Sequence, residues 1–357
     1  MADDHAPGAD KPAVGDVRAN HRFDEARLEW WLGANIGEFE GPMSVSQFQR
    51  GASNPTFMIT AGGRRYVLRK KPPGQLLASA HQVDREYRVM KALGGIGFPV
   101  PVMRAFCSDE SVIGTPFYVM DFLDGRIFRN ARLPGMTPAE RTAIYDELSS
   151  TMARLHAVDY EAIGLGDYGR PGNYFVRQID RWTKQYRGAE TTRIEAMEQL
   201  IDYLPRRMPA DDTTTIAHGD YRLENVMYHP VEPRIIAVLD WELSTLGHPL
   251  ADLGYGCILW HNHSESWGTL DGVDLAEAGI PTEQQYVDAY CRRTGRVIDD
   301  FDFYLGFSLF RLASISQGVF KRNLDGIGNA DASGDNSGTR MLAETAWAVL
   351  QRGRAAA

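Results

Sequence analysis

The sequence predicts an α+β fold in which a small antiparallel sheet comes first and a mainly helical region follows. Two short β-type runs, residues 57–60 and 66–69, flank an Ala-Gly-Gly turn at 61–63, which is a hairpin pattern. A helical pattern over 78–95 and a further strand pattern over 115–125 follow. Beyond Gly125 most of the chain shows the spacing of amphipathic helices, so the fold changes character near that residue.

We expect three segments: a disordered tail over 1–20, a sheet with one helix over 21–123, and a helical part over 124–357. The helix after Thr137 has an N-cap, a proline at its first position and Glu140 at the capping-box position. Helices are further predicted over 23–36, 174–186, 192–204, 249–260, 282–294 and 299–322, with a loop over 323–337.

Composition narrows the classes of function. The 357 residues are 43% hydrophobic and 24% charged, with a formal net charge of -9, which argues against a broad nucleic-acid surface. The polar start of the chain and the absence of a long apolar run indicate neither a signal peptide nor a membrane span. Three widely spaced cysteines fit a reducing cytoplasm. The oligomeric state stays open, a homodimer included.

The stretch "HGDYRLEN" at 218–225, with "LDWE" at 239–242, gathers the most chemistry. A hairpin centred between Glu232 and Pro233 would place Asn225 directly opposite Asp240. An amide oxygen beside a carboxylate suits magnesium, which keeps waters and substrate phosphates as its other ligands. The sequence therefore predicts a magnesium site at Asn225 and Asp240.

Asp220 and Arg222 lie in the loop that enters this hairpin. A carboxylate near a metal-bound phosphate can accept a proton from an attacking hydroxyl, and a cation can offset the developing charge. Any single Asp or Asn in a loop is more often a turn or capping residue. The combination at this spacing instead favours phosphoryl transfer.

These motifs resemble the "HGDxxxxN" catalytic loop and second metal motif of the aminoglycoside phosphotransferase and choline kinase superfamily, which is similar to protein kinases. The resemblance implies a bilobal protein-kinase-like fold, with a sheet lobe that binds nucleotide and a helical lobe. It makes Asp220 the catalytic base, Asn225 a magnesium ligand and Asp240 the main magnesium ligand. The implied cofactors are ATP and Mg²⁺, although the residues alone do not distinguish ATP from GTP.

Other family positions match in order. "FQRGASNPTFMI" is similar to the loop that covers the nucleotide, with Gly51, Ser53 and Asn54 as phosphate donors. "YVLRKKPPG" stands where the family has its phosphate lysine, so Arg69 or Lys71 would contact phosphate and Glu86 would pair with that cation. "YVMDFLDG" resembles the hinge, where Asp121 and Leu123 would meet adenine through backbone groups.

A narrower resemblance is to the kinase-like domain of acyl-CoA dehydrogenase family members ten and eleven. It implies a small-molecule kinase whose acceptor hydroxyl belongs to a hydroxyacyl-CoA or a hydroxy acid of acyl catabolism. Two alternatives stay open. One is an aminoglycoside kinase, and the other is an inactive nucleotide-binding pseudokinase, which Arg69 in place of lysine would suit.

Several residues carry weaker signals. We expect His156 to be packed, Asp252 to bond the backbone of the "HGDYRLEN" loop, and Glu242 to brace that region. The "HNH" run at 261–263 has no metal-type partners in the sequence. Trp260, Trp267, Phe307 and Arg311 either line a substrate site or pack in the core, and Arg311 could hold a carboxylate or phosphate.

Overall fold

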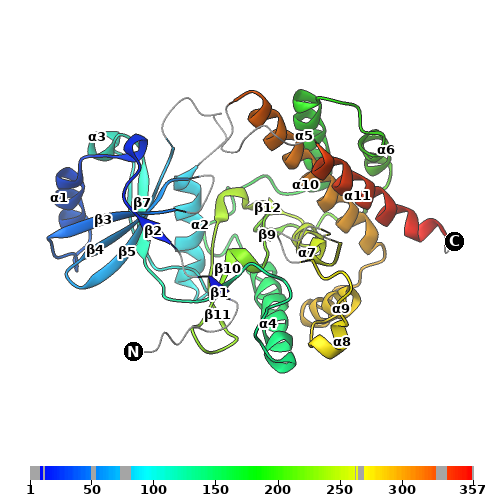
Figure 1. The fold of residues 1–357 in the computed structure, drawn as a ribbon, viewed down its shortest axis with the longest axis horizontal. Helices are drawn as coiled ribbons and strands as arrows, with labels where there is room; N and C mark the ends of the chain where they lie inside the picture. Colours follow the sequence, from blue (N-terminus) through cyan, green and yellow to red (C-terminus); the bar gives the residue numbers. More distant parts are fainter. Residues whose placement is uncertain are drawn as a thin grey trace. The chain divides into compact units, whose positions relative to one another are not determined.

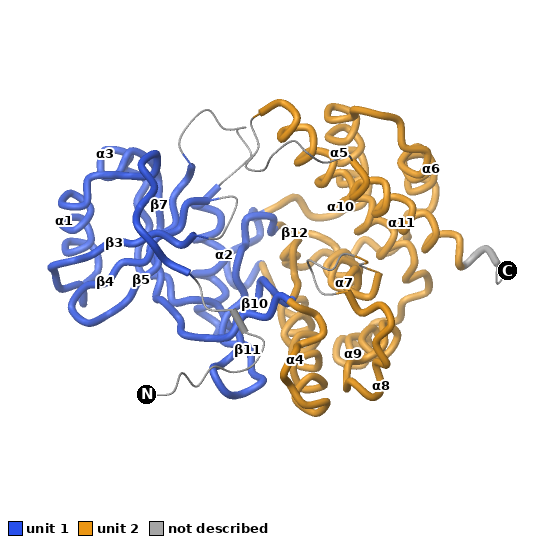
Figure 2. Tube along the Cα trace, in the orientation of Figure 1, with its two compact units in different colours: residues 1–129, 161–168, 223–244 blue, residues 130–160, 169–222, 245–357 orange. Residues whose placement is uncertain are grey.

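The computed structural model describes residues 9, 10, 13–49, 54–72, 82–261, 263, 269–326 and 336–355. The chain divides into two compact units (Figure 2). Unit 1 contains residues 1–129, 161–168 and 223–244, and unit 2 contains residues 130–160, 169–222 and 245–357. The expected boundary at 123 lies close to the end of the first segment. The hairpin expected in the helical part is grouped with the sheet instead.

Unit 1 is built on a six-stranded antiparallel sheet (Figure 1), and the predicted α+β class is confirmed. The strand order is β2-β3-β4-β5-β7-β6, and each neighbouring pair is antiparallel. The strands are β2 (Val14–Gly15), β3 (Met43–Phe48), β4 (Thr56–Ala61), β5 (Arg64–Lys70), β6 (Met103–Cys107) and β7 (Phe117–Asp121).

The two faces of this sheet have different coverings. Helices α1 (Glu25–Asn35) and α3 (Glu110–Ile113) pack on the face that carries Tyr66 and Leu68 of β5. Helix α2 (Val83–Gly95) contacts β6 and β7 and presents buried Glu86 toward Arg69 of β5. Because side chains alternate along a strand, Arg69 and its neighbour Lys70 point to opposite faces. This alternation decides which of the two cations meets α2.

Part of the expected tail is ordered. β1 (Ala9–Asp10) pairs with β8 (Ile127–Phe128), and β2 pairs with β3. A 3-10 turn, η1 (Ala19–His21), follows. The prediction of a tail without a role in the fold is wrong for these residues, because their backbone groups complete strand pairs that composition does not reveal.

The hairpin after "HGDYRLEN" forms, but its predicted register is wrong by one residue. Strands β10 (Val226–Tyr228) and β11 (Ile235–Val238) pair Val226 with Val238. A bulge at Met227/Tyr228 shifts the ladder, and the backbone N–H of Leu239 donates to the carbonyl of Asn225 at 2.8 Å. Asn225, at the end of η3 (Leu223–Asn225), therefore faces Leu239.

Unit 2 is mainly helical. Its central helix α10 contacts α5, α7 and α11, while α4 packs on α9 and α11 on α6 (Figure 1). The helices are α4 (Pro138–His156), α5 (Tyr174–Ala189), α6 (Glu195–Tyr203), α7 (Pro249–Cys257), α8 (Leu275–Ala278), α9 (Glu283–Thr294), α10 (Phe301–Leu324) and α11 (Ser337–Ala355). Short turns are η2 (Leu204–Arg206) and η5 (Ile258–His261), and β9 (Thr215–Ala217) pairs with β12 (Thr245–Gly247).

The capping box predicted for α4 is present, with Thr137 and Glu140 each bonded to the other's backbone. α10 runs two residues beyond its predicted end, and α11 was not predicted. α7 and α10 approach closely at Gly254, where a Cβ atom would lie 2.5 Å from the carbonyl oxygen of Tyr304. A glycine is therefore what allows the two helices to pack at this spacing.

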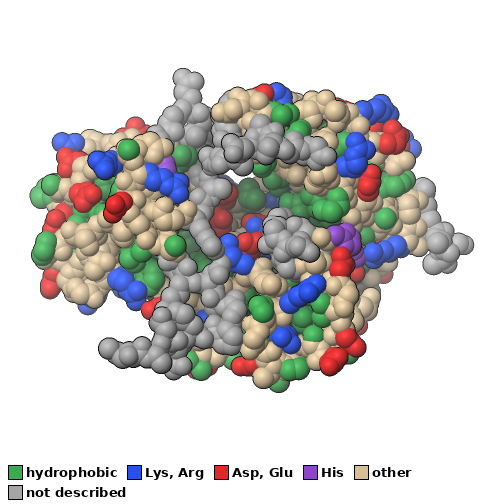
Figure 3. Space-filling model, viewed as in Figure 1, with side chains coloured by type: hydrophobic (Ala, Val, Ile, Leu, Met, Phe, Trp, Pro, Cys, Tyr) green, Lys and Arg blue, Asp and Glu red, His purple; other side chains and the backbone are tan. Residues whose placement is uncertain are grey.

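Within the described residues, no helix combines the length and apolar character that crossing a membrane requires. On the face seen in Figure 3, basic and acidic side chains are interspersed on both units.

Candidate active site

A three-carboxylate ion-pair cluster surrounds Arg69 in unit 1. Its Nε atom lies 3.3 Å from Glu86, and its Nη2 atom lies 2.9 Å from Asp240 and 3.5 Å from Glu242. Burial alone would lower the pKa of Arg69, but Glu86 and Asp240 outweigh it and raise the pKa above its ordinary value. Arg69 is therefore a permanent cation that draws residues from β5, α2 and the segment after β11 together.

Glu86 is held from several sides. It is 1% exposed and accepts hydrogen bonds from Asn54 at 2.9 Å and from the Tyr118 hydroxyl at 2.9 Å. Burial raises its pKa, and Arg69 opposes that shift. Asn54, predicted as a phosphate donor, thus uses its side-chain amide on Glu86. Ser53 and Gly51 lie outside the described residues.

The two lysines that follow Arg69, Lys70 and Lys71, have different surroundings from it. Lys70 is buried between Phe23 and Phe57, at 5.6 and 5.9 Å from their ring centroids, and burial lowers its pKa. Lys71 lies just beyond the end of β5, so strand alternation does not fix its side chain beside Arg69. Of the two predicted phosphate cations, the structure brings Arg69 together with Glu86.

The hinge candidates lie at and after the end of β7. The backbone N–H of Asp121 donates to Val102 at 2.9 Å, and its carboxylate accepts two hydrogen bonds from Arg104 at 2.6 and 2.8 Å. The Asp121 N–H is therefore committed to the fold. Leu123 follows in a segment without regular structure, where its backbone is the remaining candidate for adenine.

The predicted metal ligands are neighbours across the end of the hairpin, although not directly opposed. Asp240 follows Leu239 and adopts a left-handed backbone conformation, φ +62°, at the start of η4 (Trp241–Leu243). That conformation ends the strand alternation and turns the carboxylate to Arg69. The amide and carboxylate oxygens of Asn225 and Asp240 are the donor types that fit magnesium. A cation here would compete with Arg69 for Asp240.

The first half of the "HGDYRLEN" loop belongs to unit 2 and is pinned by α7. The carboxylate of Asp252 accepts the backbone N–H groups of His218 at 2.6 Å and Gly219 at 2.7 Å. His156 also contacts Asp252 at 3.3 Å and Tyr290 at 2.8 Å. Burial pushes the pKa of Asp252 up, but these hydrogen bonds outweigh it and lower the pKa. The structural roles expected for Asp252 and His156 are confirmed.

Asp220 follows that pinned pair. Its backbone N–H donates to His218 Nδ1 at 3.2 Å, and its carboxylate lies 3.3 Å from Arg222 Nε. The hydroxyl of Tyr255, on α7, is hydrogen-bonded to Asp220, and burial together with that carboxylate raises the Tyr255 pKa. Arg222 thus pairs with the candidate base itself. The loop backbone positions Asp220, while Arg222 and Tyr255 orient its carboxylate.

Sequence reasoning missed Tyr118 and Tyr255, which contact Glu86 and Asp220. Both are buried tyrosines in apolar segments, and their sequence context indicates only core packing. The available signal for Tyr255 was helical spacing, because it follows Asp252 by three residues on α7 and so shares its face.

The two described histidines of the "HNH" run pair with different carboxylates. His261 contacts Glu283 at 3.0 Å, His263 contacts Asp271 at 2.6 Å, and Asn262 is outside the described residues. Among the described residues, no group of three or more His, Cys, Asp or Glu side chains is arranged so that it could hold a metal ion by itself. Trp260 donates to Pro281, and Phe307 is fully buried, so packing explains both. Trp267 lies outside the described range.

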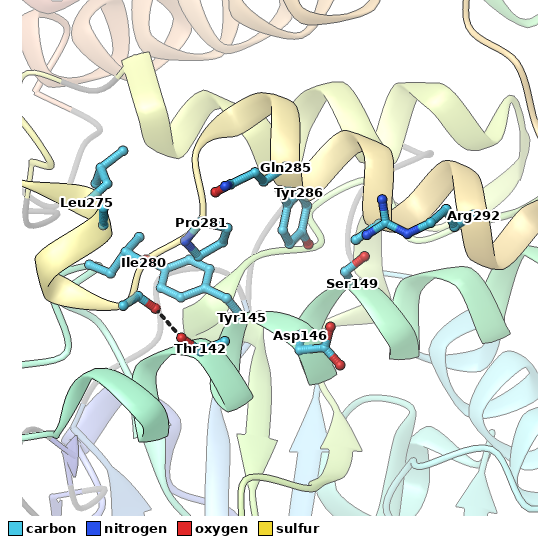
Figure 4. A pocket seen from close by; sticks show the side chains of 13 residues that line it. Thr142, Tyr145, Asp146, Ser149, Leu275, Ile280, Pro281, Gln285, Tyr286 and Arg292 are labelled. Carbon is cyan, nitrogen blue, oxygen red and sulfur yellow. Dashed lines mark hydrogen bonds between the residues drawn. The ribbon is translucent and has the colours of Figure 1, made fainter.

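A pocket of about 470 Å³ opens within unit 2 between α4 and the α8–α9 segment (Figure 4). Thr142 and Tyr145 of α4 face Ile280, Pro281 and Tyr286 across it. Its described lining residues include none of the predicted site residues. The chemistry of the two motifs therefore lies elsewhere.

Solved structures share the whole fold. A protein from Ralstonia eutropha, described as a "putative aminoglycoside phosphotransferase", is 51% identical with a TM-score of 0.85, over 93% of this chain and 99% of that one. Choline kinase from Cryptosporidium parvum has a TM-score of 0.64 at 14% identity, over 93% and 96% of the chains. An aminoglycoside phosphotransferase in complex with ADP and hygromycin B has a TM-score of 0.58 at 15% identity, over 91% and 98%. The last two support the fold alone.

Curated relatives are longer proteins. Acyl-CoA dehydrogenase family member 10 of Mus musculus is 45% identical over 94% of this chain and 32% of its own length. Family member 11 of Homo sapiens is 43% identical over 92% of this chain and 43% of its own length. The chain thus spans less than half of these relatives. A profile of the phosphotransferase enzyme family matches residues 44–294, and the chain belongs to that family.

Proposed function

We propose that this protein transfers the γ-phosphate of ATP to a hydroxyl group of a small molecule in a magnesium-dependent reaction. The observation that carries the proposal is the Arg69 cluster. One guanidinium contacts a carboxylate from α2 and a carboxylate of the metal motif. The pair of Arg69 with Glu86 corresponds to the cation–glutamate ion pair that kinases use beside the nucleotide phosphates. Membership of the phosphotransferase enzyme family supports the same reaction class.

Each residue has a distinct part in the proposed reaction. Asp220 accepts the proton as the acceptor oxygen attacks the γ-phosphorus, and the bond to the ADP oxygen breaks. Arg69 contacts the phosphates, and Arg222 offsets charge on the transferring group. Asn225 and Asp240 would hold magnesium, which supplies charge neutralisation on the phosphates. Asp252 fixes the loop that carries Asp220.

For the acceptor, we propose a hydroxyacyl-CoA or a free hydroxy acid of acyl catabolism. The support is the similarity to acyl-CoA dehydrogenase family members 10 and 11 over almost the whole chain. Because this chain spans less than half of those proteins, the connection is an analogy between neighbouring activities.

Two other functions have specific support. An aminoglycoside acceptor follows from the description given to the 51% identical Ralstonia protein. A pseudokinase follows from Arg69 itself, because the guanidinium pairs with the very carboxylate proposed to bind magnesium. Magnesium-dependent ATP turnover separates the pseudokinase from the two kinases.

The decisive experiment measures phosphate transfer from ATP to four acceptor panels: hydroxyacyl-CoAs, free hydroxy acids, amino alcohols and aminoglycosides. Asp220→Asn should lower turnover by about two to four orders of magnitude, the usual effect of losing a general base. Nucleotide-dependent thermal stabilisation should remain, because Asp220 lies outside the Arg69 cluster.

Asp202→Asn is the matched control, because this exposed carboxylate of α6 pairs only with nearby Arg206 in the described residues. It should leave turnover unchanged. Full activity in Asp220→Asn would refute the role of Asp220. Nucleotide binding without transfer to any panel would favour the pseudokinase.

A further inference from the structure

A buried arginine in unit 2 has no acidic partner among the described residues. Arg311, on α10, is 5% exposed, and no described carboxylate lies within ion-pair distance of it. Its Nε atom is buried without a hydrogen-bond partner among the described residues. Buried charges in proteins are normally paired, because removing an ion from water is costly. Core packing alone does not explain this residue.

The surroundings of Arg311 are aromatic. Its guanidinium carbon lies 5.4 Å from the ring centroid of Trp182 on α5 and 5.5 Å from that of Tyr255 on α7. Cation–π contacts of this kind stabilise a guanidinium without neutralising it. The rings of Trp182 and Tyr255 hold the guanidinium in place, and its charge stays unneutralised.

A second arginine approaches the same indole ring. The guanidinium of Arg181, on α5, lies 5.2 Å from the Trp182 centroid and is exposed to solvent. Although the side chain reaches solvent, the partial burial of its guanidinium and the nearby charge of Arg311 lower the pKa of Arg181. No described carboxylate forms an ion pair with Arg181 either. Two cations thus share one ring in a protein whose formal net charge is -9.

Two described carboxylates of unit 2, Asp252 and Asp220, already have other partners. Asp252 accepts two backbone N–H groups and contacts His156. Asp220 pairs with Arg222 and accepts the hydroxyl of Tyr255. Tyr255 therefore touches the candidate base with its hydroxyl and Arg311 with its ring. One side chain, Tyr255, therefore separates the proposed site of proton transfer from Arg311, which has no acidic partner in the described part of the chain.

We propose that Arg311, assisted by Arg181, binds an oxyanion of the phosphate acceptor, so that the acceptor is a hydroxylated carboxylate or phosphate ester. This inference rests on the proposed kinase function, because it assigns the bound oxyanion to the molecule that accepts the phosphate. The planar guanidinium can hold such a group through two hydrogen bonds. A polycationic aminoglycoside would meet repulsion at the same place. The subsite thus selects for anionic acceptors.

The test uses binding first, so that it does not depend on turnover. Straight-chain hydroxycarboxylates are compared with their carboxamides, which keep the shape and remove the charge, by calorimetry. We expect the wild-type protein to bind the carboxylates at least tenfold more tightly. Arg311→Gln should abolish that preference, and Arg311→Lys should keep part of it. Equal affinity for carboxylate and carboxamide in the wild type would overturn the proposal.

A second arm identifies the source of the anion. Hydroxyacyl-CoAs are compared with hydroxyacyl-pantetheines, which lack the nucleotide phosphates. A preference for the CoA form that disappears in Arg311→Gln assigns the subsite to phosphate, and a preference for free acids assigns it to carboxylate. If Arg311→Gln does not fold, Arg181→Gln should weaken the same preference, and an unchanged preference in Arg181→Gln and Arg311→Lys would refute the subsite.

Kinetics separate this proposal from the proposed function. Arg311→Gln should raise KM for the anionic acceptor about tenfold or more and change kcat little, because the subsite binds a part of the acceptor that does not react. Transfer that is equally efficient to charged and uncharged acceptors would refute the subsite and leave the kinase function standing. Charge-selective binding without ATP turnover would refute the kinase function and leave the anion subsite standing.

Discussion

At the scale of single residues, Arg69 shows how one side chain can satisfy a buried acid. Glu86 is almost fully buried, and Arg69 is its charged partner. Arg69→Met should lower the free energy of unfolding by about 3–5 kcal/mol, the usual cost of leaving a buried charge without its partner. Urea denaturation of the variant measures this directly.

The double variant Arg69→Met/Glu86→Gln is the matched control. Because it removes both charges, it should recover a large part of the stability lost in Arg69→Met. A single variant as stable as the wild type would mean that Glu86 does not depend on Arg69. A double variant no better than the single one would point to packing as the cause.

The same residue marks a limit of sequence reasoning. The sequence predicted that either Arg69 or Lys71 would pair with Glu86. In the structure Arg69 forms that pair. The sequence did not predict that Asp240 would join the cluster. That contact depends on the left-handed backbone of Asp240, a conformation that sequence alone indicates reliably only for glycine.

At the scale of elements, α7 begins with a histidine that acts as its cap. His248 Nδ1 accepts the backbone N–H of Leu250 at 3.2 Å, and its other nitrogen lies 3.1 Å from Asp211. Nδ1 must be unprotonated to accept, so the neutral ring donates from Nε2. Burial lowers the pKa of His248, and Asp211 opposes this only in part.

This cap makes stability depend on pH. Between the lowered pKa of folded His248 and its ordinary value near 6.5, the unfolded chain binds more protons than the folded one. The His248 contribution is therefore complete above that ordinary value and is lost as pH falls below it, with a slope of at most about 1.4 kcal/mol per pH unit. Asparagine also caps helices and does not titrate.

Unfolding free energies of the wild type and His248→Asn, measured from pH 7.5 to 5, should therefore converge as the pH falls. His263→Asn serves as the control, because His263 is half exposed and pairs with exposed Asp271. Parallel curves for the wild type and His248→Asn would exclude the cap as the source of the pH dependence.

Some elements can be predicted from the sequence more easily than others. The α4 capping box was predictable because Thr137, Pro138 and Glu140 each act locally. The register of the β10–β11 hairpin was not, because a bulge at Met227/Tyr228 adds a residue that no local pattern reveals. β1 and β2 were missed because two-residue strands are defined by their partners.

At the scale of the whole molecule, nucleotide and metal should stabilise the folded chain together. With ATP and magnesium at about 100 times the dissociation constant, mass action adds about 2.7 kcal/mol to the free energy of unfolding. In Asp240→Asn the magnesium-dependent part should disappear. Asparagine tolerates the left-handed backbone as aspartate does, so the loss would report on charge and not on strain.

Thermal unfolding with ATP alone, magnesium alone and both measures this coupling. Asp124→Asn is a suitable control, because Asp124 is exposed and pairs with exposed Arg65. Equal magnesium dependence in the wild type and Asp240→Asn would remove Asp240 from the metal site. Full stabilisation by ATP without metal would contradict the proposed ligand pair.

The fold class and the family were legible from the sequence because they rest on whole-chain order and on two motifs. The pairing of buried charged side chains could not be predicted from the sequence, since it depends on which of them come into contact in the folded chain. Arg311 illustrates this: its sequence context allowed a ligand or a surface partner, and only its burial between Trp182 and Tyr255 removes the surface partner.

Gly254 limits which substitutions the contact between α7 and α10 tolerates. It sets the closest approach of α7 to α10, where a Cβ would meet the carbonyl of Tyr304. The next residue, Tyr255, contacts both Asp220 and Arg311. Even alanine at 254 would have to push the helices apart, and Tyr255 would move with them. A substitution at this position, which alters no charge, would therefore change where Tyr255 lies relative to Asp220 and Arg311, and with it the geometry of the proposed acceptor subsite.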